Sequence, residues 1–182
     1  TKKVVFDESV KDALPTTAAY MFLSFEELES IEHIDYLNTK NVTDMSFMFK
    51  DCGKLTEIDL SHFNTKEVLT MEQMFYGCAK VKKLDVSTFQ PSPSFQPSQI
   101  KNMSGMFNGC AAVDTIKLGY ILWSSCMAED LSYMFANCTN LKEIEGINHL
   151  VDIYVTDVQG MFQNCENLTS IDLSYWQASL SS

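Results

Sequence analysis

The sequence predicts a right-handed α/β solenoid of about six coils, with a parallel sheet on one face and short helices on the other. Three observations carry this prediction: a short motif recurs at nearly constant spacing, a strand-like stretch follows each copy, and a stretch with helical spacing leads into each copy. Of the 182 residues, 46% are hydrophobic and 20% are charged, which is ordinary for a folded domain. We expect a single domain, with an N-terminal cap at residues 1–19 and the solenoid at residues 20–182.

The recurring motif is Met-Phe-x-x-Cys, and a degenerate copy, Met21-Phe22-x-x-Phe25, has Phe in place of Cys. Successive Met residues are separated by 27, 26, 32, 28 and 27 residues, so one unit is copied with one insertion. A unit of this length cannot bury its apolar residues alone, and the copies must therefore stack. The five full copies end at Cys52, Cys78, Cys110, Cys138 and Cys165.

Each unit has a strand half and a second half that forms a helix or a helical turn. Ile58 and Leu60 alternate with polar residues, as in a half-buried strand. Asn64-Thr65 is a suitable helix N-cap, because the Asn side-chain oxygen can accept a backbone N–H. The residues that follow place apolar side chains on one helical face: Val68, Met71, Met74, Phe75 and Cys78.

The frame Leu-x-x-Ile-x-Leu-x-x-Phe-Asn, at Leu55–Asn64, resembles the strand frame of leucine-rich repeats. The fuller pattern, residues 38–63, resembles the repeat of the BspA-like leucine-rich-repeat surface proteins of host-associated bacteria and some mucosal protozoa. This resemblance covers nearly the whole chain, from about Val4 to Trp176, and departs from the pattern at Lys117-Leu118-Gly119. It implies a leucine-rich-repeat-like solenoid at the cell surface or secreted, with a role in adhesion or ligand binding and no catalytic motif to transfer.

The net charge of −11 and the isoelectric point near 4.6 disfavour nucleic acid and anionic lipid as partners. No apolar run approaches the roughly 18–20 residues of a membrane span, so we expect no membrane insertion of this segment. The N-terminal residues lack the apolar stretch of a signal peptide, which fits either a cytosolic protein or a leader that is not in this chain. Because of the resemblance, we expect the protein to be at the cell surface or secreted.

The repeated cysteines occupy one position of the unit, and their spacing is unlike that of zinc ligands. Equivalent positions on neighbouring coils usually lie farther apart than the roughly 7 Å that a disulfide requires between Cα atoms. We therefore expect buried free thiols that act as small apolar residues. Cys126 falls at a predicted helix start instead, where it can be exposed.

The candidate binding residues are those that alternate outward along the predicted strands. Like charges about 5 Å apart in water repel by roughly 0.8 kcal/mol per pair, so an acidic column carries a small cost. Either these carboxylates are solvated or bonded to local backbone, or they receive a basic partner or a cation. Solenoid sheets commonly bind ligands, which favours this face. The candidates are Glu32, Glu57, Asp59, Lys83, Asp85, Lys117, Glu143, Glu145 and Asp172.

The insertion, Gln90–Ser98, is rich in Pro and Ser and predicts a protruding loop. Phe95 near its tip is a second contact candidate, with packing against the coil as the alternative. A separate aromatic column could indicate sugar stacking, but its register with leucines in other copies favours core packing. That column is Phe63, Phe89, Trp123 and Trp176.

No nucleophile, metal or phosphate-binding motif is present, so we expect no enzyme activity, no cofactor and no metal site. The favoured function is non-catalytic binding of a host or microbial protein, such as a host extracellular-matrix or cell-surface protein, through the strand face. A glycan is the other ligand class considered. The alternative is an intracellular leucine-rich-repeat scaffold for protein interactions, which the free cysteines would fit.

Overall fold

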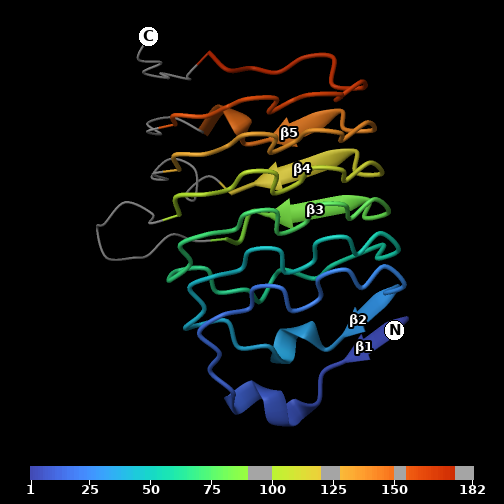
Figure 1. Cartoon of the computed structure of the whole chain (residues 1–182), viewed down its shortest axis with the longest axis vertical. Coiled ribbons are helices and arrows are strands. Elements are labelled where there is room, and N and C mark those ends of the chain that lie inside the picture. The colour runs from blue at the N-terminus through green and yellow to red at the C-terminus, as the bar shows by residue number, and fades with distance from the viewer. Residues whose placement is uncertain (90–99, 120–127, 150–154, 175–182) are drawn as a thin grey trace.

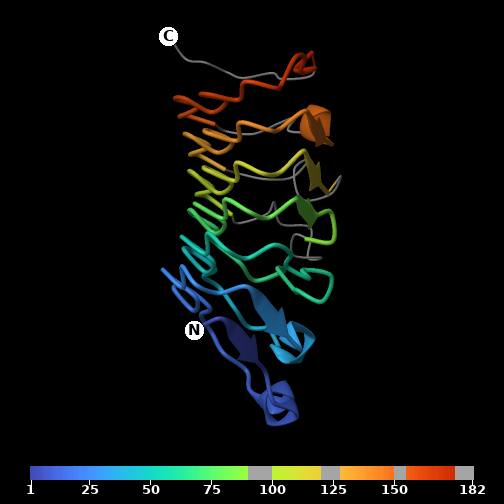
Figure 2. The ribbon, with the colours of Figure 1, turned by 90° about the vertical axis from the view of Figure 1, so that its right-hand side faces the viewer.

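The computed structural model describes residues 1–89, 100–119, 128–149 and 155–174. The repeats are stacked along the long axis, from the N-terminal end to the C-terminal end (Figure 1). Figure 2 shows the strands toward one side of this stack and the zigzag segments that contain the Met-Phe-x-x-Cys motifs on the opposite side. We refer to these segments as the Met–Cys turns.

The strands form two parallel sheets, as the sequence predicts for stacked copies. In the first, β1 (Lys3–Val5) pairs with β2 (Ser30–Glu32). In the second, β4 (Thr115–Leu118) lies between β3 (Lys83–Val86) and β5 (Glu143–Glu145). Equivalent positions of successive repeats are paired within each sheet, whereas the equivalent residues 57–60, between β2 and β3, form no regular strand.

A second parallel ladder, which the sequence pattern does not predict, runs where each Met–Cys turn begins. Its members are joined by single bridges, and the side-chain oxygen of each accepts a hydrogen bond from the backbone N–H two residues later. Asn, Asp, Ser and Thr favour such local turns. The column consists of Thr17, Asp44, Thr70, Asn102, Asp130 and Asp157.

Residues 1–19, predicted as a cap, contribute to both ladders. β1 pairs with the strand position of the next repeat, and Thr17 bridges to Asp44. Between them lies a 3₁₀ helix, η1 (Glu8–Asp12), whose first turn is capped by the Asp7 carboxylate. The boundary between cap and solenoid stays a prediction.

The predicted helices opposite the sheet are wrong. Within the described ranges the helices are short 3₁₀ turns: η1, η2 (Ile34–Tyr36) and η3 (Ile147–His149). In the Met–Cys turns, backbone N–H groups alternate between two acceptors: Met74 N donates to Met71 O within the turn, whereas Phe75 N donates to Met106 O of the next repeat. In an α-helix every interior N–H donates to a carbonyl of the same helix. Here alternate N–H groups donate to the next repeat instead, so the segment forms turns that are joined between repeats and not a helix.

Two residues of each Met–Cys turn adopt positive φ angles, the first just before Met and the second just before Cys. In one repeat these are Gln73 (φ 49°) and Gly77 (φ 72°). Each residue with positive φ interrupts the right-handed backbone, because a right-handed helix requires negative φ at every residue. Two such residues four positions apart therefore prevent a continuous α-helix. The same two positions in the other repeats are Tyr20, Ser24, Phe47, Asp51, Gly105, Gly109, Tyr133, Asn137, Gly160 and Asn164.

The buried set predicted for the Met–Cys segment is confirmed, although the helix is not. Val68, Met71, Met74, Phe75 and Cys78 are all buried. The motif phenylalanines stack nearly parallel, with ring centroids 5.3–5.8 Å apart and interplanar angles of 2–13°. Their column is Phe22, Phe49, Phe75, Phe107, Phe135 and Phe162.

The aromatic column at the strand ends also lies in the core where it is described. Phe63 and Phe89 are buried and stacked, with ring centroids 6.4 Å apart. Core packing is therefore confirmed for these two residues, and they are not a sugar-stacking surface. Trp123 and Trp176 lie outside the described residues.

The motif cysteines are free thiols, as predicted, and they also join the repeats. Each Sγ donates to the backbone oxygen of the motif Phe in the preceding repeat, at 3.0–3.3 Å; one example is Cys78 Sγ to Phe49 O. Burial raises the pKa of Cys52 and Cys138 to about 12, which keeps both protonated as donors. Cys126 lies outside the described residues.

Candidate functional site

The predicted strand-face residues are all exposed. Along β3 the side chains of Lys83 and Asp85 point outward, whereas Leu84 and Val86 are buried. The exposed set therefore lies partly on the two sheets and partly, at Glu57, Asp59 and Asp172, on stretches without regular strand structure. This set comprises Glu32, Glu57, Asp59, Lys83, Asp85, Lys117, Glu143, Glu145 and Asp172.

The three-stranded sheet brings part of this set together. Asp85, Lys117 and Glu145 stand side by side in the parallel register of β3, β4 and β5. The ammonium of Lys117 lies 3.2 Å from a Glu145 carboxylate oxygen. A cavity of about 270 Å³ opens on this surface, lined by Lys83, Leu84, Asp85, Thr115, Lys117 and Glu145.

The aspartates of the strand face are bonded to local backbone, one of the alternatives that the sequence left open. Asp59, Asp85 and Asp172 each accept a hydrogen bond from the backbone N–H of the Ser two residues later, at 2.9–3.0 Å. Hydrogen bonds from Ser61, first its hydroxyl and then its N–H, lower the pKa of Asp59 below its ordinary value. These carboxylates therefore stabilise local turns and are still exposed to solvent.

The remaining candidate residues that the structure describes lie outside the cluster around Asp85, Lys117 and Glu145. Glu32 pairs with Lys3 of the preceding strand, and Glu57 is exposed on a stretch without regular strand structure. Glu143 lies opposite Thr115 in the register of β5 with β4. Phe95, the candidate in the insertion, lies outside the described residues.

Sequence reasoning missed the ion pairs between neighbouring repeats. Lys54 Nζ lies 2.6 Å from Glu27 Oε1, and Lys101 Nζ lies 3.7 Å from Glu129 Oε1. The available signal was their separation by about one repeat, 27 and 28 residues. Exposed pairs of this kind add little stability but fix the charge pattern of the surface.

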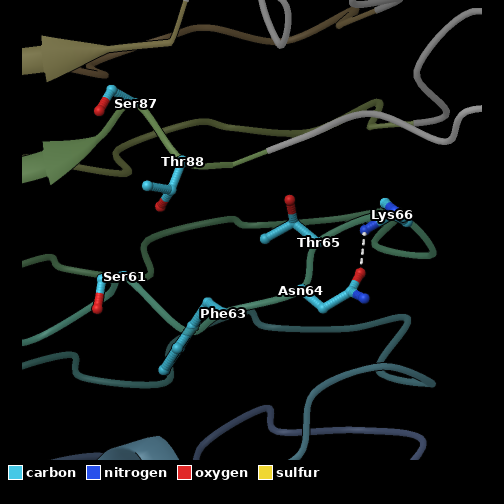
Figure 3. A pocket seen from close by; sticks show the side chains of 7 residues that line it. All are labelled: Ser61, Phe63, Asn64, Thr65, Lys66, Ser87 and Thr88. Carbon is cyan, nitrogen blue, oxygen red and sulfur yellow. Dashed lines mark hydrogen bonds between the residues drawn. The ribbon is translucent and has the colours of Figure 1, made fainter.

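A second hollow lies at the edge of the strand face and was also missed. We call it the edge cavity: it has a volume of about 460 Å³ and is shown in Figure 3. An adjoining cavity of about 380 Å³ shares Asn64 and Lys66 with it. The edge cavity is lined by Ser61, Phe63, Asn64, Thr65, Lys66, Ser87 and Thr88.

The described part of the chain contains no group of three or more His, Cys, Asp or Glu residues arranged to hold a metal ion. Over the same ranges, no helix has both the length and the apolar character needed to cross a membrane. The chemistry that the two surfaces offer is hydrogen bonding and ion pairing with a ligand.

Stacked repeats with parallel strands and a repeated Leu/Ile frame define a protein of the leucine-rich-repeat class. The fold is similar to that of a leucine-rich repeat protein from T. pallidum, with a TM-score of 0.55 and 18% identity over 92% of this chain and 78% of that one. The chain belongs to the family described as Mycoplasma protein of unknown function, DUF285, whose profile matches residues 16–143 and 80–181.

A second solved structure, a leucine-rich repeat protein from Bacteroides ovatus ATCC 8483, aligns with a TM-score of 0.43 and 15% identity. That alignment covers 93% of this chain and 48% of the other, so the chain spans about half the length of that protein. A search of curated proteins finds no match.

Proposed function

We propose that the chain is a non-catalytic protein-binding module, a right-handed solenoid of about six coils that binds its partner through the strand face. The observation that carries this proposal is the cluster of Lys83, Asp85, Lys117 and Glu145 around a hollow on β3, β4 and β5. The leucine-rich-repeat fold supports it, because stacked repeats present extended surfaces suited to protein partners.

The charges of the strand face define the partner's chemistry. Seven of the nine candidate residues are acidic and two are lysines, so a predominantly basic protein surface complements them. Lys117 already has an intramolecular partner in Glu145, so Lys83 and Asp85 are better placed to pair with groups on the partner. Long-range attraction to a basic partner would speed association and weaken as salt is added.

For the biological setting, we propose a cell-surface or secreted adhesion protein of the BspA-like type, with a host or microbial protein as its partner. The repeat pattern at residues 38–63 supports this proposal, and host extracellular-matrix proteins are the first partners to test. The alternative is an intracellular scaffold, which is favoured by a different observation: the five described cysteines are all free.

The test is a binding screen against matrix and cell-surface proteins with the wild-type chain and an Asp59→Asn/Asp85→Asn/Asp172→Asn variant. Asn keeps the oxygen that accepts the local N–H, so this variant should fold while losing three charges. A matched control, Glu26→Gln/Glu129→Gln/Glu166→Gln, removes three exposed carboxylates elsewhere.

We expect the strand-face variant to bind the partner about tenfold more weakly and to lose most of the salt dependence of the association rate. The control should bind as the wild type does. Equal weakening in both variants would reduce the effect to net charge, and unchanged binding in the strand-face variant would reject this face as the binding surface.

A further inference from the structure

The edge cavity has a composition unlike that of the rest of this acidic protein. Among the described residues, its wall contains four hydroxyl side chains, one amide and one ammonium group, and no carboxylate. The chain as a whole carries a net charge of −11. At about 460 Å³ the cavity is within the range of small-ligand sites. A polar hollow with one positive charge selects for a polar ligand that carries a negative charge.

The hydroxyl groups on its strand side are oriented by the aspartates. Ser61 Oγ donates to Asp59 Oδ1 at 2.6 Å, and Ser87 Oγ donates to Asp85 Oδ1. A hydroxyl has one hydrogen and two lone pairs, so both oxygens keep only acceptor capacity toward the cavity. The ligand must therefore supply O–H or N–H donors on this side.

The opposite side of the cavity offers donors. Asn64 Oδ1 accepts from the backbone N–H of Lys66 at 3.1 Å, which leaves the Asn64 amide hydrogens for a ligand (Figure 3). Over the described ranges, the Lys66 ammonium forms no ion pair. An anionic oxygen is the group that these two donors recognise best.

The turn recurs in the preceding repeat, although there the Asn38 side-chain amide donates to Lys11 O at 3.5 Å. Asn38-Thr39-Lys40 repeats as Asn64-Thr65-Lys66, and Asn38 Oδ1 accepts from Lys40 N at 3.2 Å. Lys40 lines the adjoining cavity, whose described wall also contains Lys66 and one carboxylate, Glu67, so its charged groups leave a net positive charge. Two lysines from consecutive repeats therefore face one continuous edge, where a ligand with successive negative charges would meet both.

We propose that this edge binds an acidic saccharide, a chain of sugar units that carry carboxylates. The sugar hydroxyls donate to the Ser61 and Ser87 oxygens, one carboxylate pairs with Lys66, and the carboxylate of the next unit pairs with Lys40. Hydroxyl donors and carboxylate acceptors occur together in a uronic acid, which matches both sides of the edge cavity. The two lysines of this site lie outside the protein-binding strand face, whereas its Ser61 and Ser87 hydroxyls are bonded to two strand-face residues, Asp59 and Asp85. Substitution of Lys66 therefore tests this site independently of the proposed protein binding.

The experiment is calorimetric titration of the intact chain with three probes of similar length: an oligogalacturonate, a neutral oligosaccharide and an oligoglutamate. We expect measurable binding of the oligogalacturonate alone. Lys66→Met should weaken it about tenfold or more, because a charge-assisted hydrogen bond is lost. Lys80→Met, which removes an exposed lysine outside both cavities, should leave the affinity unchanged.

A Ser61→Ala/Ser87→Ala variant tests the hydroxyl side, and we expect it to weaken binding about three- to tenfold. A Glu143→Gln/Glu145→Gln variant alters only the strand face and should bind the saccharide as the wild type does. Thermal melting of each variant confirms folding. Equal binding of oligoglutamate or of the neutral sugar, retained affinity in Lys66→Met, or no binding of any probe would each overturn the proposal.

Discussion

On the strand side, the outward residues change in charge from repeat to repeat: Asp85, Lys117 and Glu145 occupy one row of the sheet. On the Met–Cys side, the inward residues hardly change: Phe75 stacks on Phe107, and Cys110 donates to Phe75 O as each of the other motif cysteines donates to the Phe of its preceding repeat. Both sides of each repeat contact the repeats before and after it. The difference shows that inward positions, which pack one repeat on the next, keep the same residue types, whereas outward strand positions vary in charge.

The largest effect should come from breaking the phenylalanine column. Phe75 is fully buried and stacks on Phe49 and Phe107. Phe75→Ala should lower the free energy of unfolding by about 3–5 kcal/mol, because it opens a cavity and removes two ring contacts. Urea unfolding measures this change, and Glu143→Ala on the strand face is the control, which should change it by less than about 0.5 kcal/mol.

The next effect should appear at alkaline pH. Burial raises the pKa of Cys52 and Cys138 from an ordinary 9.0 to about 12, and raises those of Cys78 and Cys110 well above the ordinary value. A raised pKa gives stability that is fully present below the unfolded value and is lost as pH rises through the folded one. Stability should therefore fall between about pH 9 and 12.

Melting temperature measured against pH, with a Cys78→Ala/Cys110→Ala variant, checks this loss. The variant should be less stable at neutral pH but decline less steeply in alkali, since two titrating thiols are gone. An identical alkaline slope in both proteins would show that these thiols do not control the decline.

A smaller effect should follow from substituting a left-handed residue. At Gly77 (φ 72°) an added Cβ would lie 2.6 Å from Asp51 Oδ1. Gly77→Ala should cost about 1–2 kcal/mol, and Gly77→Asn should cost less, because Asn tolerates this conformation and occurs at the equivalent position 137. Equal costs for Ala and Asn would argue against backbone strain as the cause.

The smallest effect should come from the strand-end turns. Asp59→Ala removes the acceptor for Ser61 N–H and should cost less than about 1 kcal/mol, because the site is exposed to solvent, whereas Asp59→Asn should cost less still. Since the pKa of Asp59 is lowered, its contribution is present above the ordinary value of 3.8 and is lost as pH falls through the folded one. Acid titration of wild type and Asp59→Asn checks this sign.

The repeat, the parallel strands and the buried column could be predicted because each rests on residue type at fixed spacing. The helix could not be excluded by that spacing, since consecutive short turns also bury residues about three apart. A better signal was present: Gly and Asn recur just before the motif Met and Cys, as at Gly105, Gly109 and Asn164, and these residues favour positive φ.

The strand face could be predicted from the sequence, whereas the edge cavity could not. Alternation along one strand was enough to predict that Asp85 and Lys117 face outward. The edge cavity required knowledge of which residues of two repeats meet, such as Ser61 and Ser87 with Lys66. The acceptor of each cysteine is a backbone oxygen one repeat away, which no side-chain pattern reveals.

The stacking of Phe75 on Phe107 crosses the insertion without a break. Their motifs are separated by 32 residues instead of 26–28, yet the ring centroids are 5.8 Å apart, as in the other repeats. Buried Phe89 and buried Ile100 flank the added residues. The core thus tolerates extra residues between Phe89 and Ile100. This position is therefore suited to sequence diversification and to grafting a foreign peptide without changing the core.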